Sequence, residues 1–273
     1  MWCKTCNIET NEELCPVCGS ATIEDIPTEV YWCAHCETPV IQVATQADKG
    51  FCPLCKRKMK YLSADLRPVF PEERLLLELL LGEEPFTYVE KSVWAANSRY
   101  YINGKSVSIP SKTFQEANTD ALSKALEQNK GQNTYEYFDK HIASFIKANK
   151  LRLHYLKDEA YTFIKKATEK YDEEHIVLSF SGGKDSTVTA DIVIKTLGNP
   201  SLVHIFGDTT LEFPSTIEYA ARYRESHPLA IFQVAKNREQ IFYDVCEDIG
   251  PPARMMRWCC SMFKTGPITR VIN

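Results

Sequence analysis

Apolar residues in the last hundred positions recur with alternating strand and helix spacing. Residues 176–180 form a short apolar run of strand length, and residues 186–197 place apolar side chains at helical intervals. The same alternation continues with a predicted strand at 201–206, a helix at 214–226 and a strand at 230–234. This order predicts an α/β domain whose parallel sheet has right-handed crossovers.

The middle of the chain has a different pattern. Residues 72–81 have the spacing of an amphipathic helix, which Gly82 should end. Short strands at 92–95, 99–102 and 107–109, with an Asn103-Gly104 hairpin turn, follow. Helical patterns then cover 112–128 and 134–170, and we expect the second to cover one face of the α/β sheet. The predicted domains are therefore a cysteine-rich segment at 1–62, a small α+β linker domain at 63–133, and a helical lead-in with the α/β domain at 134–273.

Length and composition restrict the class of protein. A chain of 273 residues is expected to hold two or more domains, and 44% hydrophobic with 25% charged residues is typical of soluble globular proteins. Runs of 18 apolar residues and a signal-peptide core are absent from the sequence, which predicts a cytoplasmic protein with no membrane association.

Charge is unevenly distributed along the chain. The net charge of −4 does not indicate that the protein as a whole binds nucleic acid. Residues 140–170, however, hold eight Lys and Arg against three acidic residues. Residues 251–273 hold four Lys and Arg and no acidic residue. A solvated helix face together with a nucleotide site is favoured over an anionic partner as the explanation.

Eight of the eleven cysteines lie before residue 56, in four Cys-x-x-Cys pairs: Cys3/Cys6, Cys15/Cys18, Cys33/Cys36 and Cys52/Cys55. Each pair can present two thiolates to a tetrahedral ion, so two pairs complete a Cys₄ site. We therefore expect two zinc ions in tandem ribbons. Disulfides, redox dithiols and an iron–sulfur cluster are the competing explanations, and an interleaved pairing stays open. His35 is interpreted as a bystander.

The ribbons have two interpretations beyond metal binding. In the first, zinc serves only to fold a segment that is too small to bury a core. Alternatively, the ribbons form a docking surface for RNA, DNA or protein with Lys56–Lys60 as its basic edge. Residues 1–60 hold six basic and eight acidic residues, which favours a protein contact or scaffolding.

The sequence Ser-Phe-Ser-Gly-Gly-Lys-Asp-Ser at 179–186 links the first strand to its helix. Adjacent glycines let backbone N–H groups turn inward, and the positive end of the helix points to the same place. Lys184 with the hydroxyls of Ser181 and Ser186 would add donors. This pattern predicts a phosphate-binding loop, although the Walker A spacing is absent. Asp208–Thr210 follow the next strand and should lie at the same edge of the sheet.

The motif Ser-Gly-Gly-x-Asp-Ser resembles the signature of the PP-loop ATP pyrophosphatases, or adenine nucleotide alpha-hydrolase-like proteins. Residues 204–216, with Asp208-Thr209, and residues 257–267, with Cys259-Cys260 and Lys264, are similar to motifs of the phosphoadenosine phosphosulfate (PAPS) reductase branch. Thr210 stands where that branch has glycine. The resemblance covers residues 175–273 and implies a parallel-sheet PP-loop domain, here preceded by zinc ribbons and the α+β unit.

The resemblance also implies roles for individual residues. Catalysis would involve Lys184, Asp185 and Lys264, with Asp185 capping the helix, orienting the loop or holding Mg²⁺ with ATP. The nucleotide-binding residues would be Ser179, Ser181, Gly182, Gly183, Lys184, Asp185, Ser186, Asp208, Thr209, Thr210 and Arg257. Related reductases bind a [4Fe–4S] cluster through an adjacent cysteine pair, which implies that use for Cys259 and Cys260. No cysteine follows Cys260 in the sequence. Three explanations of the cysteine pair therefore stay open: its remaining cluster ligands lie beyond Asn273, the pair is a vestige, or it performs thiol chemistry directly. We expect the domain to be incomplete at its C-terminus.

Three functions follow from this resemblance. The first is an enzyme that binds PAPS, adenosine phosphosulfate (APS) or ATP for sulfur-group reduction or transfer, as an oxidoreductase or a transferase. The alternative is an ATP pyrophosphatase-type sulfurtransferase that modifies tRNA or DNA, or a non-enzymatic nucleotide-binding subunit of a larger assembly. A homo-oligomer or a redox partner would accompany the first function.

Overall fold

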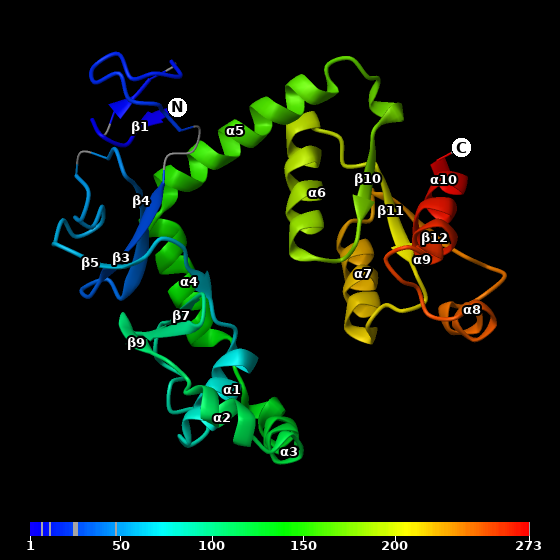
Figure 1. Ribbon diagram of the computed structural model, residues 1–273, viewed down its shortest axis with the longest axis horizontal. Helices are drawn as coiled ribbons and strands as arrows, with labels where there is room; N and C mark the ends of the chain where they lie inside the picture. Colours follow the sequence, from blue (N-terminus) through cyan, green and yellow to red (C-terminus); the bar gives the residue numbers. More distant parts are fainter. Residues whose placement is uncertain (7, 11, 24–26, 47, 273) are drawn as a thin grey trace. The chain divides into compact units, whose positions relative to one another are not determined.

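The computed structural model describes residues 1–273 except residues 7, 11, 24–26, 47 and 273 (Figure 1). The chain packs as two compact units, Met1–His154 and Tyr155–Asn273. The expected mixed α/β class, with a parallel sheet in the second unit and two groups of four cysteines near the N-terminus, is confirmed. None of the helices in the described ranges is long and apolar enough to cross a membrane.

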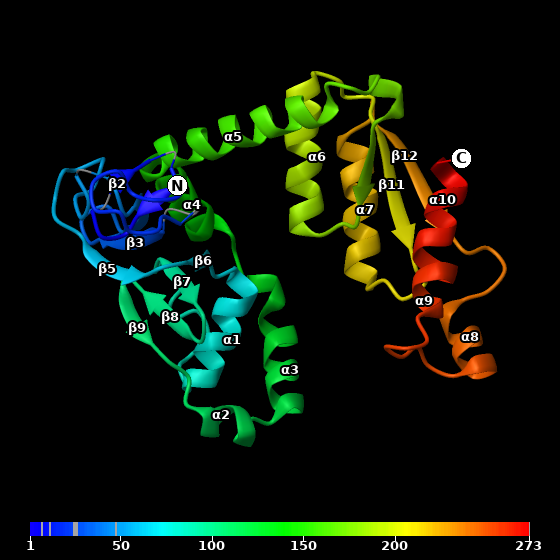
Figure 2. The same ribbon diagram turned by 45° about the horizontal axis from the view of Figure 1, so that its top comes forward.

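The second unit is built on a three-stranded parallel sheet of order β10-β11-β12. Its strands are β10 (Val177–Phe180), β11 (Val203–Asp208) and β12 (Ile231–Lys236). Helices α6 (Lys184–Leu197) and α7 (Pro214–Ser226) connect them. Since the strands follow one another in sequence order, right-handed crossovers place both helices on one face of the sheet (Figure 2).

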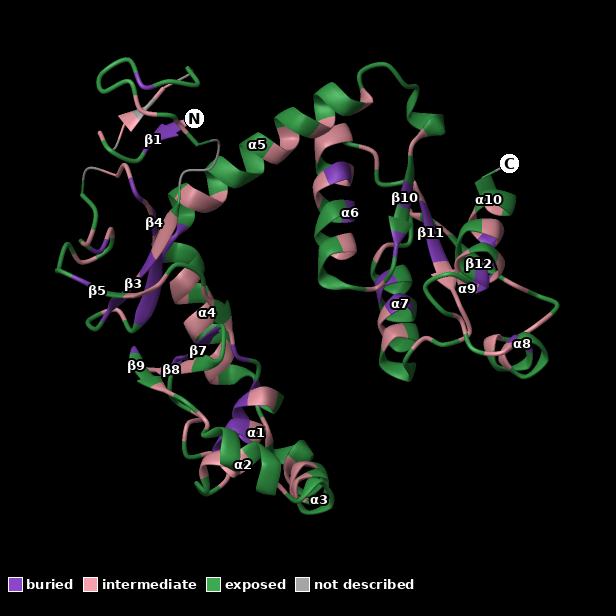
Figure 3. Cartoon of the chain, viewed as in Figure 1, coloured by how far each residue is buried: buried purple, intermediate pink, exposed green. Residues whose placement is uncertain are grey.

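The core of the second unit lies between this sheet and the two helices. Leu178 and Phe180 from β10 pack with Ala190 and Val193 of α6 and with Tyr223 of α7. The buried positions of α6 and α7 are separated by exposed ones, as expected for helices with one face on a sheet (Figure 3). The end of α5 (Lys150–Thr168) adds Ile164 to this cluster, and η2 (Glu173–His175) precedes β10.

The C-terminal segment covers the other face of the sheet. It comprises α8 (Phe242–Ile249), α9 (Trp258–Cys260), the π-helical turn η3 (Ser261–Thr265) and α10 (Gly266–Ile272), and α10 contacts β11 and β12. Val245, Trp258 and Phe263 form its buried cluster. A side chain at Gly266 would collide with the carbonyl oxygen of Ser261, so the π-helical turn requires glycine there.

The described residues of the first unit form three small sheets. The cysteine-rich part has the pair β1 (Trp2–Cys3) and β2 (Ile8–Glu9), and the sheet β4-β3-β5 with strands Thr38–Val43, Thr28–Cys33 and Lys60–Ser63. A four-stranded antiparallel sheet follows, made of β6 (Arg67–Pro68), β7 (Val93–Ala96), β8 (Arg99–Ile102) and β9 (Lys105–Val107). The predicted Asn103-Gly104 turn joins β8 to β9, and both residues have the positive φ angles, 47° and 73°, of a type I′ turn.

The helices of the first unit begin with α1 (Pro71–Leu81), which ends at Gly82 as predicted. The others are α2 (Ser111–Glu116), α3 (Thr119–Asn129), the short η1 (Lys130–Gln132) and α4 (Glu136–Ala148). The helix expected to run through 134–170 is broken at Asn149, because this buried side chain accepts a hydrogen bond from Ile41 N (2.7 Å) and donates one to Pro39 O (3.0 Å). Helix α4 packs on β4 in the first unit, and α5 carries the chain from the first unit into the second.

Candidate functional site

The loop between β10 and α6 is tied to the first turn of the helix. Ser181 N donates to Ser186 Oγ (3.2 Å), and the hydroxyl oxygens of Ser181 and Ser186 lie 3.1 Å apart. Ser186 Oγ also donates to Gly183 O (3.0 Å). The loop is therefore held in one conformation at the positive end of α6.

Gly182 lies close to the start of α7. Its φ is +73°, and a Cβ atom there would lie 3.2 Å from Thr216 Cγ2. Next to it, the hydroxyls of Thr187 and Tyr219 are 3.1 Å apart. Thr216 ends the 204–216 motif of the sequence analysis, where it was given no role of its own. Sequence reasoning did not select Thr187 or Tyr219, whose signal was proximity to the glycine motif and to the start of α7.

Of the two glycines in the loop, Gly182 has a backbone conformation that favours glycine, and Gly183 does not. We expect Gly182→Ala to destabilise the second unit by about 1–2 kcal/mol, because alanine is strained at positive φ and meets Thr216. Gly183→Ala is the matched control, since Gly183 has a φ of −83° and a Cβ there would make an ordinary 3.5 Å contact with Ser181 Oγ. Urea unfolding of both variants measures the difference, and equal loss of stability would contradict the assignment of strain to Gly182.

Lys184 is the first residue of α6, and its side chain is exposed. A cation in the first turn of a helix is opposed by the helix dipole, whereas Asp185 beside it is favoured there. Across the described residues, Lys184 has no salt bridge that would offset this cost. The arrangement leaves a positive charge without an ion-pair partner beside the N-terminus of a helix, and an anion is stabilised at such a place.

Asp208 is the last residue of β11 and is mostly buried. One carboxylate oxygen accepts from Thr210 N (2.8 Å) and the other from Lys236 Nζ (2.8 Å) at the end of β12. Sequence reasoning missed Lys236, because 28 residues separate the two partners. Both oxygens of Asp208 are engaged, so its main effect is to hold the carboxyl ends of β11 and β12 together.

The turn after β11 is held by its threonines. Thr210 has a φ of +65°, which is an unfavourable conformation for a β-branched residue, and its hydroxyl accepts from Phe242 N (2.8 Å) at the start of α8. Thr209 Oγ1 donates to Glu212 (2.8 Å). Strain of this kind is maintained only where surrounding contacts fix the backbone, and it often occurs at functional sites.

The remaining candidate residues lie on β10 and in the C-terminal segment. Ser179 is an exposed residue of β10, and Lys264 is exposed on η3. Arg257 Nη2 lies 3.7 Å from the sulfur of Cys260, and the sulfurs of Cys259 and Cys260 are 4.0 Å apart. Within the described ranges, no third metal-ligating side chain joins this cysteine pair.

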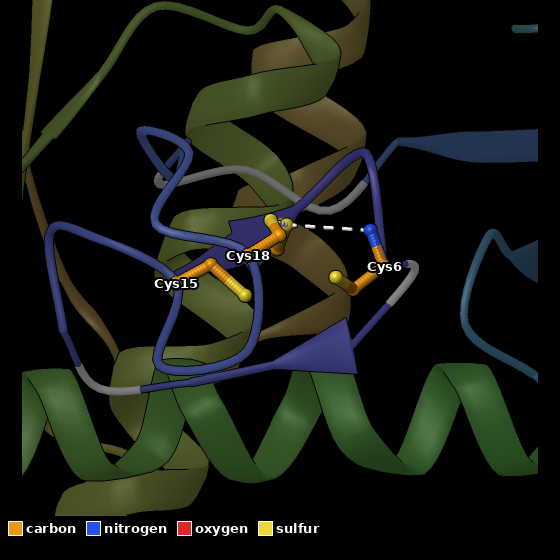
Figure 4. A group of neighbouring side chains, drawn as sticks. Cys6, Cys15 and Cys18 are labelled. Carbon is orange, nitrogen blue, oxygen red and sulfur yellow. Dashed lines mark hydrogen bonds between the residues drawn. The ribbon is translucent and has the colours of Figure 1, made fainter.

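The first group of four cysteines comprises Cys3, Cys6, Cys15 and Cys18, whose sulfurs all lie within 4.8 Å of one another. Figure 4 shows Cys6, Cys15 and Cys18 with their sulfurs turned toward one region. Cys3 Sγ and Cys18 Sγ are 3.5 Å apart, and Cys6 N donates to Cys3 Sγ (3.4 Å). Hydrogen bonds from Ser20 lower the pKa of Cys18 to about 6, so a thiolate is favoured there.

Cys33, Cys36, Cys52 and Cys55 form the second group with the same geometry. The distance from Cys33 Sγ to Cys55 Sγ is 3.5 Å, and Cys52 Sγ lies 3.9 Å from Cys36 Sγ. The backbone N–H of Arg57 lowers the pKa of Cys55 to about 7, while burial raises that of Cys36. His35 is exposed and bonds to Arg57, outside the cysteine group.

The distances between the cysteine sulfurs in each group distinguish a zinc site from a disulfide. A tetrahedral ion with Zn–S bonds of about 2.3 Å requires sulfurs about 3.8 Å apart, and a disulfide requires about 2.05 Å. The observed separations fit a tetrahedral ion and do not fit disulfides. The structure thus shows two Cys₄ sites, paired in sequence order, that could bind zinc or an iron–sulfur centre.

Comparison with known proteins agrees with the geometry of the second unit. Residues 175–273 match the family described as the phosphoadenosine phosphosulfate reductase domain, which confirms the resemblance drawn from the motifs. An uncharacterized protein of Methanocaldococcus jannaschii is 30% identical over 147 residues, which make up 54% of this chain and 30% of that protein. A second uncharacterized protein of the same organism is 33% identical over 134 residues, 48% of this chain and 31% of that protein. The chain spans about a third of the length of these curated relatives.

Proposed function

We propose that the chain binds an adenine nucleotide at the loop 181–186 for sulfur-group reduction or transfer, because residues 175–273 match the phosphoadenosine phosphosulfate reductase domain family. The nucleotide is PAPS, APS or ATP, which share the adenosine phosphate core. The phosphate or sulfate lies against the backbone N–H groups that begin α6.

One observation supports this proposal above the others. Lys184 is placed where a cation is unfavourable for the helix, and its side chain is exposed beside the loop in which Gly182 has a φ of +73°. A bound anion is attracted both by the ammonium group and by the positive helix terminus, and this attraction offsets the repulsion between those two. The lysine is therefore better explained by ligand binding than by folding.

The other predicted residues take supporting roles in the proposal. Ser181 turns its hydroxyl toward the anion, and Ser186 fixes the loop through its hydrogen bond to Gly183 O. Asp185 stabilises the start of α6, and Asp208–Thr210 shape the neighbouring turn. Arg257 and Lys264, which are exposed in a segment without acidic residues, add positive charge for the substrate. The [4Fe–4S] cluster at Cys259 and Cys260, and Mg²⁺ with ATP, remain predictions.

The reaction class is tested by product analysis. The purified chain is incubated with PAPS or APS and a dithiol, or with ATP and tRNA or DNA as the adenylyl acceptor, and sulfite and pyrophosphate are measured. Sulfite indicates reduction, and pyrophosphate indicates adenylating transfer. If the chain binds nucleotide tightly but forms neither product, an enzymatic role is contradicted and the chain is a nucleotide-binding subunit.

We also propose that each Cys₄ site holds one zinc ion. The sulfur spacing and the sequence-order pairing support a structural site whose four positions are all filled by protein ligands. Zinc in such a site contributes folding free energy to the ribbons.

A further inference from the structure

Two knuckles of the first unit have the same backbone and different side chains. The first carries Cys15 and Cys18 (Figure 4), and the second carries Cys52 and Cys55. In each, the first cysteine N–H donates to the carbonyl five residues later, at 2.8 Å and 2.9 Å, and an isolated antiparallel bridge closes the loop seven residues apart, as Leu14 with Ala21 and Phe51 with Lys58. The knuckles are therefore matched position by position.

The residues after the second cysteine differ in charge. The first knuckle continues Gly-Ser-Ala-Thr-Ile at 19–23, and the second continues Lys-Arg-Lys-Met-Lys at 56–60. Lys56 has a φ of +60° at the position where the first knuckle has Gly19 at +69°. A non-glycine residue in this conformation costs about 1–2 kcal/mol, so the lysine is not needed for the turn and works against it.

The four cations of the second knuckle are exposed: Lys56, Arg57, Lys58 and Lys60. None of them takes part in a salt bridge among the residues that the structure describes. Residues 49–64 contain no Asp or Glu. The surface around them, which we name the basic knuckle (Phe51–Lys60), therefore has a concentrated positive charge in an acidic chain.

An aromatic ring lies among these charges. Phe51 is 47% exposed and faces Lys58 directly in the antiparallel bridge, so the two side chains are on the same face. Exposed Lys58 and Lys60 alternate with buried Met59, which turns both lysines outward. Cations for phosphates beside an exposed ring for base stacking are the combination used to bind single-stranded nucleic acid.

We propose that the basic knuckle binds single-stranded nucleic acid through its phosphates, with Phe51 stacking on a base. This goes beyond the proposed nucleotide site and does not depend on it, because the residues belong to the first unit. An acidic protein segment would be attracted by the cations but would not need the exposed ring, so nucleic acid is favoured.

The test uses the full chain, loaded with zinc and free of nucleotide. Fluorescence anisotropy measures binding of labelled oligo-U and oligo-dT of about 15 nucleotides over a range of salt concentrations. The main variant replaces Lys56→Gly, Arg57→Ser and Lys58→Ala, which gives the second knuckle the residues of the first and preserves its fold. Lys105→Ala with Lys124→Ala, two exposed lysines of the same unit, is the matched control.

We expect the wild-type chain to bind at least one oligonucleotide and the triple variant to bind roughly tenfold or more weakly, with a salt dependence reduced by about 2 in log–log slope. Phe51→Ala should weaken binding with little change in that slope, and the control should bind normally. Tighter binding of oligo-U than of oligo-dT identifies RNA as the ligand, and the reverse preference identifies DNA. Absence of binding, equal binding by the triple variant at unchanged zinc content, or stronger competition by polyglutamate than by oligonucleotide would overturn the proposal.

Discussion

Lys184→Ala is expected to weaken adenine nucleotide binding by roughly ten- to a hundredfold, the effect of losing one charge-assisted hydrogen bond. The same change should leave folding stability unchanged or raise it by up to about 1 kcal/mol, because it removes a cation from the positive end of α6. Isothermal titration with nucleotide and urea unfolding measure the two effects.

Lys195→Ala is the control on the same helix. Lys195 lies in the last turn of α6 and pairs with Asp191 (2.7 Å), so its charge favours the helix. We expect this variant to bind nucleotide normally and to lose a few tenths of a kcal/mol of stability. If Lys184→Ala binds nucleotide as tightly as the wild type, the phosphate-loop assignment is wrong.

Replacing Cys33→Ser together with Cys52→Ser should reduce the zinc content from about two ions per chain to about one. Both cysteines are buried in a small cluster with Val40 and Met59, and that cluster has few other apolar contacts to keep it folded. The ribbon should therefore unfold locally, which increased proteolysis of the first unit would detect. Metal analysis of the purified variant gives the primary result.

Cys246→Ser serves as the control for metal content, since Cys246 packs against the C-terminal cluster and lies outside both cysteine groups. Its zinc content should equal that of the wild type. Retention of both ions by the Cys33 and Cys52 variant would contradict the pairing, and so would loss of both. Nucleotide binding should survive in the double variant, because the core around the phosphate loop contains no ribbon residue.

The local pattern was enough to predict the strand, turn and helix around the loop at 181–186. Hydrophobic spacing located β10 and α6, and the glycines located the turn between them. The end of β11 was less predictable, because Gly207 and Asp208 are poor strand residues. They are strand residues here because they pair with Ala235 and Lys236 of β12, a contact that the local sequence does not contain.

The features that the sequence did not predict depend on side-chain contacts between residues that are far apart in the chain. The break at Asn149 depends on hydrogen bonds to β4, more than a hundred residues earlier. The pair of Asp208 with Lys236 and the contact of Thr187 with Tyr219 likewise join separate elements. In contrast, the cysteine spacing predicted both Cys₄ groups correctly, since tetrahedral coordination by two knuckles restricts the separation of their ligands.

The most direct test of the central claim is calorimetric titration of the wild-type chain with PAPS, APS and ATP. We expect saturable binding of at least one of these nucleotides, and competition by inorganic phosphate or sulfate for the loop at 181–186. Absence of binding by all three nucleotides to folded, zinc-loaded protein would contradict the account.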